Sequence, residues 1–166
     1  GAAHDLALWE NLPALQWGED LYDGFKAYAS GDWDRAIDLM KGIGDRSDLG
    51  QEGTFFTVLA YCMKKQTKPA IDIARRLVKR RPGLVPARRQ LAHCLRFQGQ
   101  FLLTQNKDGL PELEESLQLF LELSSDVTMD SQVAGLYLTN ALARNKKGDF
   151  RTARKHVEAA QLIYIN

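Results

Sequence analysis

The chain has 166 residues, of which 45% are hydrophobic and 26% charged, and these proportions are ordinary for a soluble protein. This length fits one globular domain or one short array of repeats. No run of 18 apolar residues occurs, so the sequence predicts no helix that spans a membrane.

Residues 1–16 are predicted to form a short helix that caps the rest of the chain. The segment is rich in apolar side chains, Pro13 interrupts it, and Asp5 suits the position that caps a helix N-terminus. Trp9 and Trp17 favour burial against the neighbouring helices. In an alternative interpretation, this acidic segment folds back onto the basic middle of the chain as an autoinhibitory element.

A repeat with a period of about 34 residues organises the remaining sequence, and a fixed period of this size indicates stacked pairs of helices. Ala36 and Ala70 are separated by one such period, and residues 148–153 repeat the pattern of residues 31–36. In both segments a glycine is predicted to end the first helix in a left-handed conformation, and the aspartate after it is predicted to cap the second helix. Pro82 is predicted to end the second helix of the second pair.

Two kinds of side chain are expected where the paired helices meet. Trp33 and Phe150 follow the capping aspartates and are predicted to be bulky apolar anchors of the second helices. Ala36 and Ala153 come three residues later and are small, which predicts a close approach of the two helices of each pair.

The period divides the chain into four units, 17–50, 51–84, 85–130 and 131–166. The third unit is longer than the others. Its second helix is expected to come about twelve residues late, near Ser116, so residues 102–115 are predicted to be an insert. This insert contains a turn signal at residues 106–109 and Pro111, which suits the first turn of a helix.

These residues resemble the tetratricopeptide repeat family over residues 17–166. The resemblance implies an all-α fold, a right-handed superhelical stack of about four antiparallel helix pairs. The chain departs from the family pattern at the signature tryptophan early in each first helix, where it has Asp20, Thr54, Arg88 and Tyr137.

The resemblance also implies that one face of each first helix lines a concave groove that binds a partner. Carried over to this chain, that face comprises Leu21, Phe25, Phe55, Leu59, Cys62, Met63, Arg89, His93, Arg96, Phe97, Leu138, Leu142 and Asn145. Three pairs in this set, Leu21 with Phe25, Phe55 with Leu59 and Arg89 with His93, are each spaced by four residues and therefore share a helix face. Phe25 and Phe55 have a second interpretation, as core residues between helices, because aromatic side chains at helical spacing fit both roles.

The predicted groove is apolar at its N-terminal end and basic in its middle. This favours a helix or an extended peptide with an apolar stripe and an acidic flank, which Arg89 or Arg96 could hold through a bidentate pair. The clamp that holds a C-terminal carboxylate in some family members is disfavoured, because Leu21, Phe25 and Phe56 occupy the matching positions.

We therefore predict a protein-binding adaptor or scaffold. Two alternatives stay open: a chaperone-like holder of an aggregation-prone segment, and a regulatory domain of a longer, nucleic-acid-associated protein.

The net charge of +1 hides an uneven distribution of charge along the sequence. Residues 64–96 carry 11 basic and one acidic side chain, whereas residues 1–63 carry four basic and 11 acidic ones. One predicted helix face collects the basic patch Arg75, Arg76, Lys79 and Arg80. This patch is either a solvated face that balances the acidic first unit or a surface for an acidic protein partner. Nucleic acid is disfavoured because no nucleic-acid-binding motif occurs.

The sequence predicts no catalytic, metal or cofactor site. Cys62 and Cys94 have no metal-ligand partner at a suitable spacing, so we expect free thiols in a reducing, cytoplasmic environment; a disulfide is the alternative. His4, His93 and His156 have no nucleophile or carboxylate at catalytic spacing, and His156 is expected on the surface. The chain is therefore predicted not to be an enzyme.

The last predicted helix is apolar at its end, where a stack of repeats needs polar cover. Leu162, Ile163 and Ile165 are the residues concerned. Three explanations stay open: the chain is a fragment of a longer protein, these residues contact a second copy, or the extra loop of the third unit folds over this end.

Overall fold

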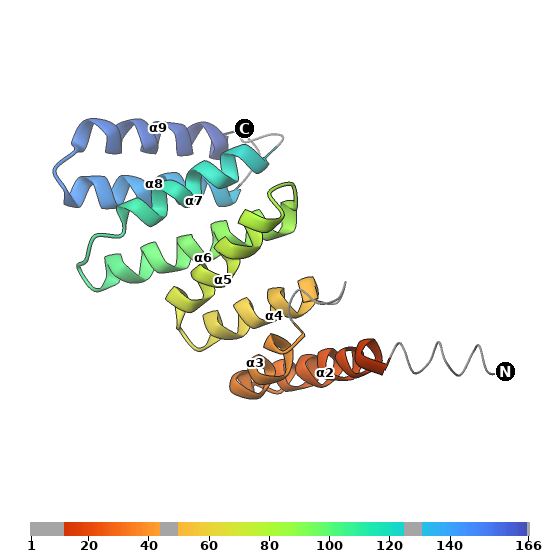
Figure 1. Ribbon diagram of the computed structural model, residues 1–166. Coiled ribbons are helices and arrows are strands. Elements are labelled where there is room, and N and C mark those ends of the chain that lie inside the picture. Colours follow the sequence, from red (N-terminus) through yellow and green to blue (C-terminus); the bar gives the residue numbers. More distant parts are fainter. Residues whose placement is uncertain (1–11, 44–49, 125–130, 166) are drawn as a thin grey trace. The chain divides into compact units, whose positions relative to one another are not determined.

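The computed structural model describes residues 12–43, 50–124 and 131–165, and the regular structure in these ranges is α-helical (Figure 1). The helices are α2 (Leu12–Ala29), α3 (Trp33–Lys41), α4 (Gly50–Met63), α5 (Thr67–Arg80), α6 (Val85–Thr104), α7 (Leu110–Leu123), α8 (Ser131–Lys146) and α9 (Phe150–Ile165). Helices α2 and α3, α3 and α4, α6 and α7, α7 and α8, and α8 and α9 pack together. The predicted all-α fold of packed helices is therefore confirmed.

The chain forms two compact units, the first ending at Ala74 and the second beginning at Arg75, within α5. In the first unit α3 packs against both α2 and α4, around a core of Ala27, Ala36, Ile37 and Ala60. In the second unit α6 to α9 lie side by side and alternate in direction (Figure 1). The largest core cluster of this unit joins all four of these helices, from Ala92 on α6 to Ile163 on α9.

The start of α2 differs from the predicted boundary between a capping segment and the first unit. The helix begins at Leu12, so it continues through residues 16 and 17. Pro13 stands in the first turn, where a helix tolerates proline because the missing N–H would have no intrahelical acceptor there. Residues 1–11, the rest of the predicted capping segment, lie outside the described residues.

The predicted glycine turns are confirmed. Gly31 and Gly148 both have a φ of +82°, which only glycine adopts without strain. The N–H of Asp32 bonds to the carbonyl of Ala27 at 2.9 Å, and that of Gly31 bonds to the carbonyl of Tyr28 at 3.1 Å. This pair of bonds is a Schellman motif, which satisfies the last carbonyls of a helix. Gly148 ends α8 with the same pattern of bonds.

The predicted aspartate caps are also confirmed. The Asp32 carboxylate accepts a hydrogen bond from the backbone N–H of Arg35 at 3.2 Å, at the start of α3. The Asp149 carboxylate accepts one from the backbone N–H of Thr152 at 3.3 Å, at the start of α9. The pKa of Asp149 is lowered, because the bond from Thr152 favours the charged carboxylate.

Two further first helices end in the same motif without glycine. Lys65 after α4 has a φ of +60° and Asn106 after α6 has a φ of +57°. The next residue in each case, Gln66 or Lys107, donates its N–H back to a carbonyl five residues earlier. One turn type therefore closes the first helix of every described pair, and two of its four positions carry residues with a side chain.

The third pair departs from the predicted insert. The interval from Lys65 to Asn106 is longer by one heptad than the interval from Gly31 to Lys65. Helix α6 absorbs most of this added length by continuing to Thr104, and α7 begins at Leu110 rather than near Ser116. The segment 102–115 is thus the end of one helix, a short turn and the start of the next.

Candidate functional site

The predicted groove residues of α2 pack against the neighbouring helix. Leu21 is buried. The Phe25 ring lies 4.4 Å, centroid to centroid, from Phe56 of α4, which also contacts Tyr28 edge-on at 5.4 Å. For Phe25 the geometry therefore matches the core interpretation, and this face of α2 meets α4.

Helix α4 carries an apolar stripe within the first unit. Leu59 and Met63 are exposed and stand one helical turn apart. Phe55 and Cys62 are half-buried at positions of the same helix face.

The predicted groove residues on α6 lie in different surroundings. A Cβ added to Gly135 of α8 would come within 2.9 Å of the Arg96 guanidinium, so Arg96 lies against that helix. The His93 ring packs edge-on against Phe120 of α7 at 5.0 Å. Arg89 is exposed and lines a small cavity with Phe120, Leu123, Ser124 and Gln132. Arg96 and His93 thus face α8 and α7.

Helix α6 exposes Val85 at its start and Phe97 and Phe101 further along. Phe97 and Phe101 stand one turn apart. Phe97 is one of the predicted groove residues and Phe101 is not, although the four-residue spacing between the two indicates a shared helix face.

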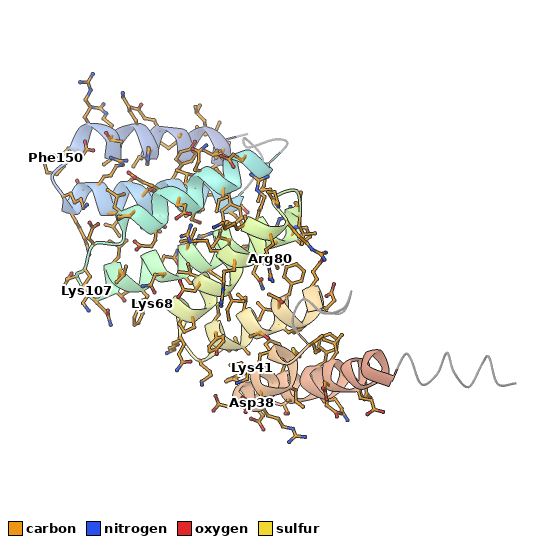
Figure 2. The ribbon with its side chains drawn as sticks, in the orientation of Figure 1. Asp38, Lys41, Lys68, Arg80, Lys107 and Phe150 are labelled. Atoms are coloured by element: carbon orange, nitrogen blue, oxygen red, sulfur yellow. The ribbon has the colours of Figure 1, made fainter. Side chains whose placement is uncertain are left out.

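A shallow apolar groove lies between α8 and α9. The predicted residues Leu138, Leu142 and Asn145 line one side, and Phe150, Ala153, Arg154 and Val157 of α9 line the other. Figure 2 shows Phe150 at the beginning of α9, and it is exposed rather than a buried anchor. Trp33, its counterpart in the first unit, instead packs edge-on against Tyr28 at 5.1 Å. The residues on the α9 side of this groove are therefore not among the predicted groove residues.

The apolar end of α9 divides between core and surface. Ile163 is buried in the main core of the second unit, so it is not available to a second copy. Leu162 and Ile165 are exposed.

The basic patch is exposed, and part of its charge is neutralised. Arg75 forms a bidentate pair with Glu115 of α7, at 2.6 and 3.1 Å. Arg76 and Lys79 are exposed on α5. Arg80, the last residue of that helix, is exposed too (Figure 2). Another cation of the basic segment, Arg88, pairs with Glu122 at 2.7 Å.

The described cysteines and histidines are Cys62, Cys94, His93 and His156. Neither Cys62 nor Cys94 forms a disulfide. His156 is half-buried, edge-on to Tyr137 at 5.4 Å, and not on the surface as predicted. Burial lowers its pKa, and the nearby Arg144 charge adds to this effect. Among the described residues no cluster of potential metal ligands occurs, and no helix has the length and apolar character to cross a bilayer.

Comparison with known proteins finds similarity in structure but not in sequence. No protein-family model matches the chain, and no curated protein matches it in sequence. Among the solved structures that match, a chain titled MamA MSR-1 C2 has a TM-score of 0.42 and 11% sequence identity. The match covers 90% of this chain and 97% of that one.

Proposed function

We propose that the chain is a non-enzymatic, protein-binding helical repeat that holds a helix or an extended peptide of a partner. One observation carries the proposal. Helices α6 and α8, the first helices of successive pairs, each expose two apolar side chains one turn apart: Phe97 with Phe101, and Leu138 with Leu142. Exposed apolar rows on a rigid scaffold are typical of protein-interaction surfaces.

Several further features support an acidic character of the partner. Arg76 and Lys79 are exposed on α5, and α9 exposes Arg151, Arg154 and Lys155. These cations would attract an acidic segment over the screening length of about 8 Å at physiological ionic strength. The apolar rows then supply most of the affinity, because surface ion pairs contribute only about 0–1 kcal/mol each.

Photocrosslinking tests the proposal. A photoreactive phenylalanine analogue replaces Phe97, and the same analogue at the exposed Gln118 of α7 is the matched control. In an extract of the source cells, we expect a defined protein adduct at position 97 that excess unlabelled chain suppresses, and none at position 118. Equal adducts at both positions, or no adduct at position 97, would contradict the proposal.

The charge component has its own test. We expect the double variant Arg76→Glu, Lys79→Glu to give less of the adduct at position 97 at low salt, while Lys107→Glu, in an exposed turn, leaves the yield unchanged. An equal effect of both changes would show that general charge, and not this face of α5, governs the capture.

A further inference from the structure

The exposed face of α8 corresponds to a buried face elsewhere in the chain. Leu138 stands ten residues before the left-handed Gly148, as Leu21 stands ten residues before Gly31. Leu21 is 8% exposed on the side of α2 that meets α4, whereas Leu138 is 41% exposed. The same position of the helix is therefore exposed to solvent on α8 and buried on α2.

Helices α7 and α9 also differ in exposure at matching positions, when residues are counted from the start of each helix. Leu110 and Leu117, the first and eighth residues of α7, are 8% and 6% exposed in the core that α7 shares with α8. Phe150 and Val157, the first and eighth residues of α9, are 65% and 36% exposed. The α8–α9 groove is thus the surface that, on the preceding pair α6–α7, is covered by a further helix.

The charges of this surface are opposite to those of the internal contact. Within the second unit, Glu114 of α7 forms an ion pair with Arg144 of α8. Counted from the helix start, the position of Glu114 in α9 is occupied by Arg154, whose side chain is 85% exposed and 3.4 Å from Glu158 on the same helix. Arg151 and Lys155 beside it are also exposed. A helix that stacks here needs a carboxylate where α8 carries Arg144.

We propose that the α8–α9 groove binds an acidic amphipathic helix of a partner protein, stacked as α8 stacks on α6–α7. Its apolar residues, spaced three and four apart, cover Leu142, Phe150 and Val157, and its acidic residue pairs with Arg154. The inference rests on the proposed protein-binding function and names the chemistry of one partner.

A second copy of the chain fits this groove poorly. Suppose that α2 of another copy stacked on this groove in the way that α8 stacks on α6–α7. Counted back from the left-handed glycine that ends each helix, Glu19 of α2 corresponds to Leu136 of α8 and Asp23 corresponds to Asn140, and both α8 residues are buried. Carboxylates would then be buried on an apolar face, which is costly without partners. If α8 of another copy stacked here, Arg144 would meet Arg154, and like charges repel.

Two labelled peptides test the inference by fluorescence anisotropy with the full chain. One has the sequence of residues 131–146, and the other has the same sequence with Arg144→Glu. We expect the Arg144→Glu peptide to bind at least tenfold more tightly than the unchanged one, and Leu142→Asp in the chain to weaken that binding at least tenfold. Tyr22→Asp, which removes an exposed aromatic side chain from α2, is the control and leaves binding unchanged.

Charge reversal in the chain gives the decisive comparison. Arg154→Glu changes an exposed side chain and keeps the fold, and we expect it to reverse the preference between the two peptides. Equal binding of the peptides, no binding, or loss of binding with Phe97→Ser instead of Leu142→Asp would overturn the inference. A dimer in sedimentation equilibrium that Leu142→Asp abolishes would overturn it in favour of a second copy. In each of these cases the crosslink at position 97 still tests the proposed protein-binding function, independently of the α8–α9 groove.

Discussion

At the scale of single residues, the left-handed positions that end α2, α4, α6 and α8 explain how the pairs turn. Gly31 and Gly148 are identifiable from sequence, because glycine before a capping aspartate is a strong local signal. Lys65 adopts the same conformation without such a signal. The turn from α4 into α5 requires a left-handed backbone at Lys65, which lysine disfavours. The sequence around Lys65 therefore does not indicate this turn.

The strain at Lys65 predicts a stabilising substitution. Lys65→Gly removes a side chain from a left-handed position that disfavours L-residues by about 1–2 kcal/mol. The greater freedom of glycine in the unfolded chain offsets part of this gain. We expect the free energy of unfolding, measured in urea, to rise by about 0.5–1 kcal/mol.

Lys65→Ala is the control, because alanine keeps the strained conformation and should give no gain. A rise as large as that of the glycine variant would show that the lysine side chain, and not the backbone, causes the strain.

The packing of His156 predicts a pH dependence of stability. Its pKa is lowered in the folded chain by burial first and by the Arg144 charge second, so the unfolded state binds more protons as pH falls below about 6.5. We expect thermal stability to decrease from pH 7 to pH 5, and to decrease less in His156→Gln. Identical slopes of melting temperature against pH for the two proteins would contradict this assignment.

At the scale of elements, α6 shows how the chain accepts extra length. The added heptad makes almost two helical turns, so each face of the helix shifts by only about 20°. The helix therefore grows without rotating its contacts away from α7 and α8. The sequence indicates extra residues and a turn near Asn106. The predicted position of the extra residues, in a loop before the second helix, is wrong, because an extended helix and a loop differ little in composition here.

The contact between α6 and α7 predicts a sensitive position at Gly99. A Cβ there would lie 2.5 Å from Cγ of Leu113 and 3.0 Å from the Gly109 carbonyl oxygen. We expect Gly99→Ala to lower the free energy of unfolding by about 1–3 kcal/mol, despite the better helix propensity of alanine.

Gly83→Ala is the matched control, since no atom lies within 4 Å of its added Cβ, and it should change stability by less than about 0.5 kcal/mol. A Gly99 variant as stable as this control would mean that the two helices separate without cost.

The helix faces mark the limit of prediction from sequence. The repeat period predicts which residues share a helix face. An apolar face that packs on the next helix and an apolar face that is exposed to solvent, however, have the same spacing of apolar residues. Phe25 and Leu142 both stand six residues before a left-handed glycine; Phe25 packs on Phe56, and Leu142 is exposed. Only the positions of the neighbouring helices separate these two roles.

At the scale of the whole molecule, a net charge of +1 is compatible with a locally charged surface. The basic segment 64–96 is partly neutralised by acidic residues far away in sequence, through Arg75–Glu115 and Arg88–Glu122. These pairs are partly exposed and contribute about 0–1 kcal/mol each, so their main effect is on the distribution of charge. Arg76 and Lys79 of this segment are exposed on α5. On α9 the exposed Arg154 lines the apolar groove with Leu142 and Phe150, and this is the combination that we expect an acidic amphipathic segment to recognise.

Hydrogen exchange of the full chain, alone and with the protein captured through position 97, tests the proposed binding surface most directly. We expect slower amide exchange in α6 and α8 when the partner is bound, and unchanged exchange in α3. Slower exchange confined to α2 and α3, or no change in any helix, would contradict binding through the first-helix faces of the second unit.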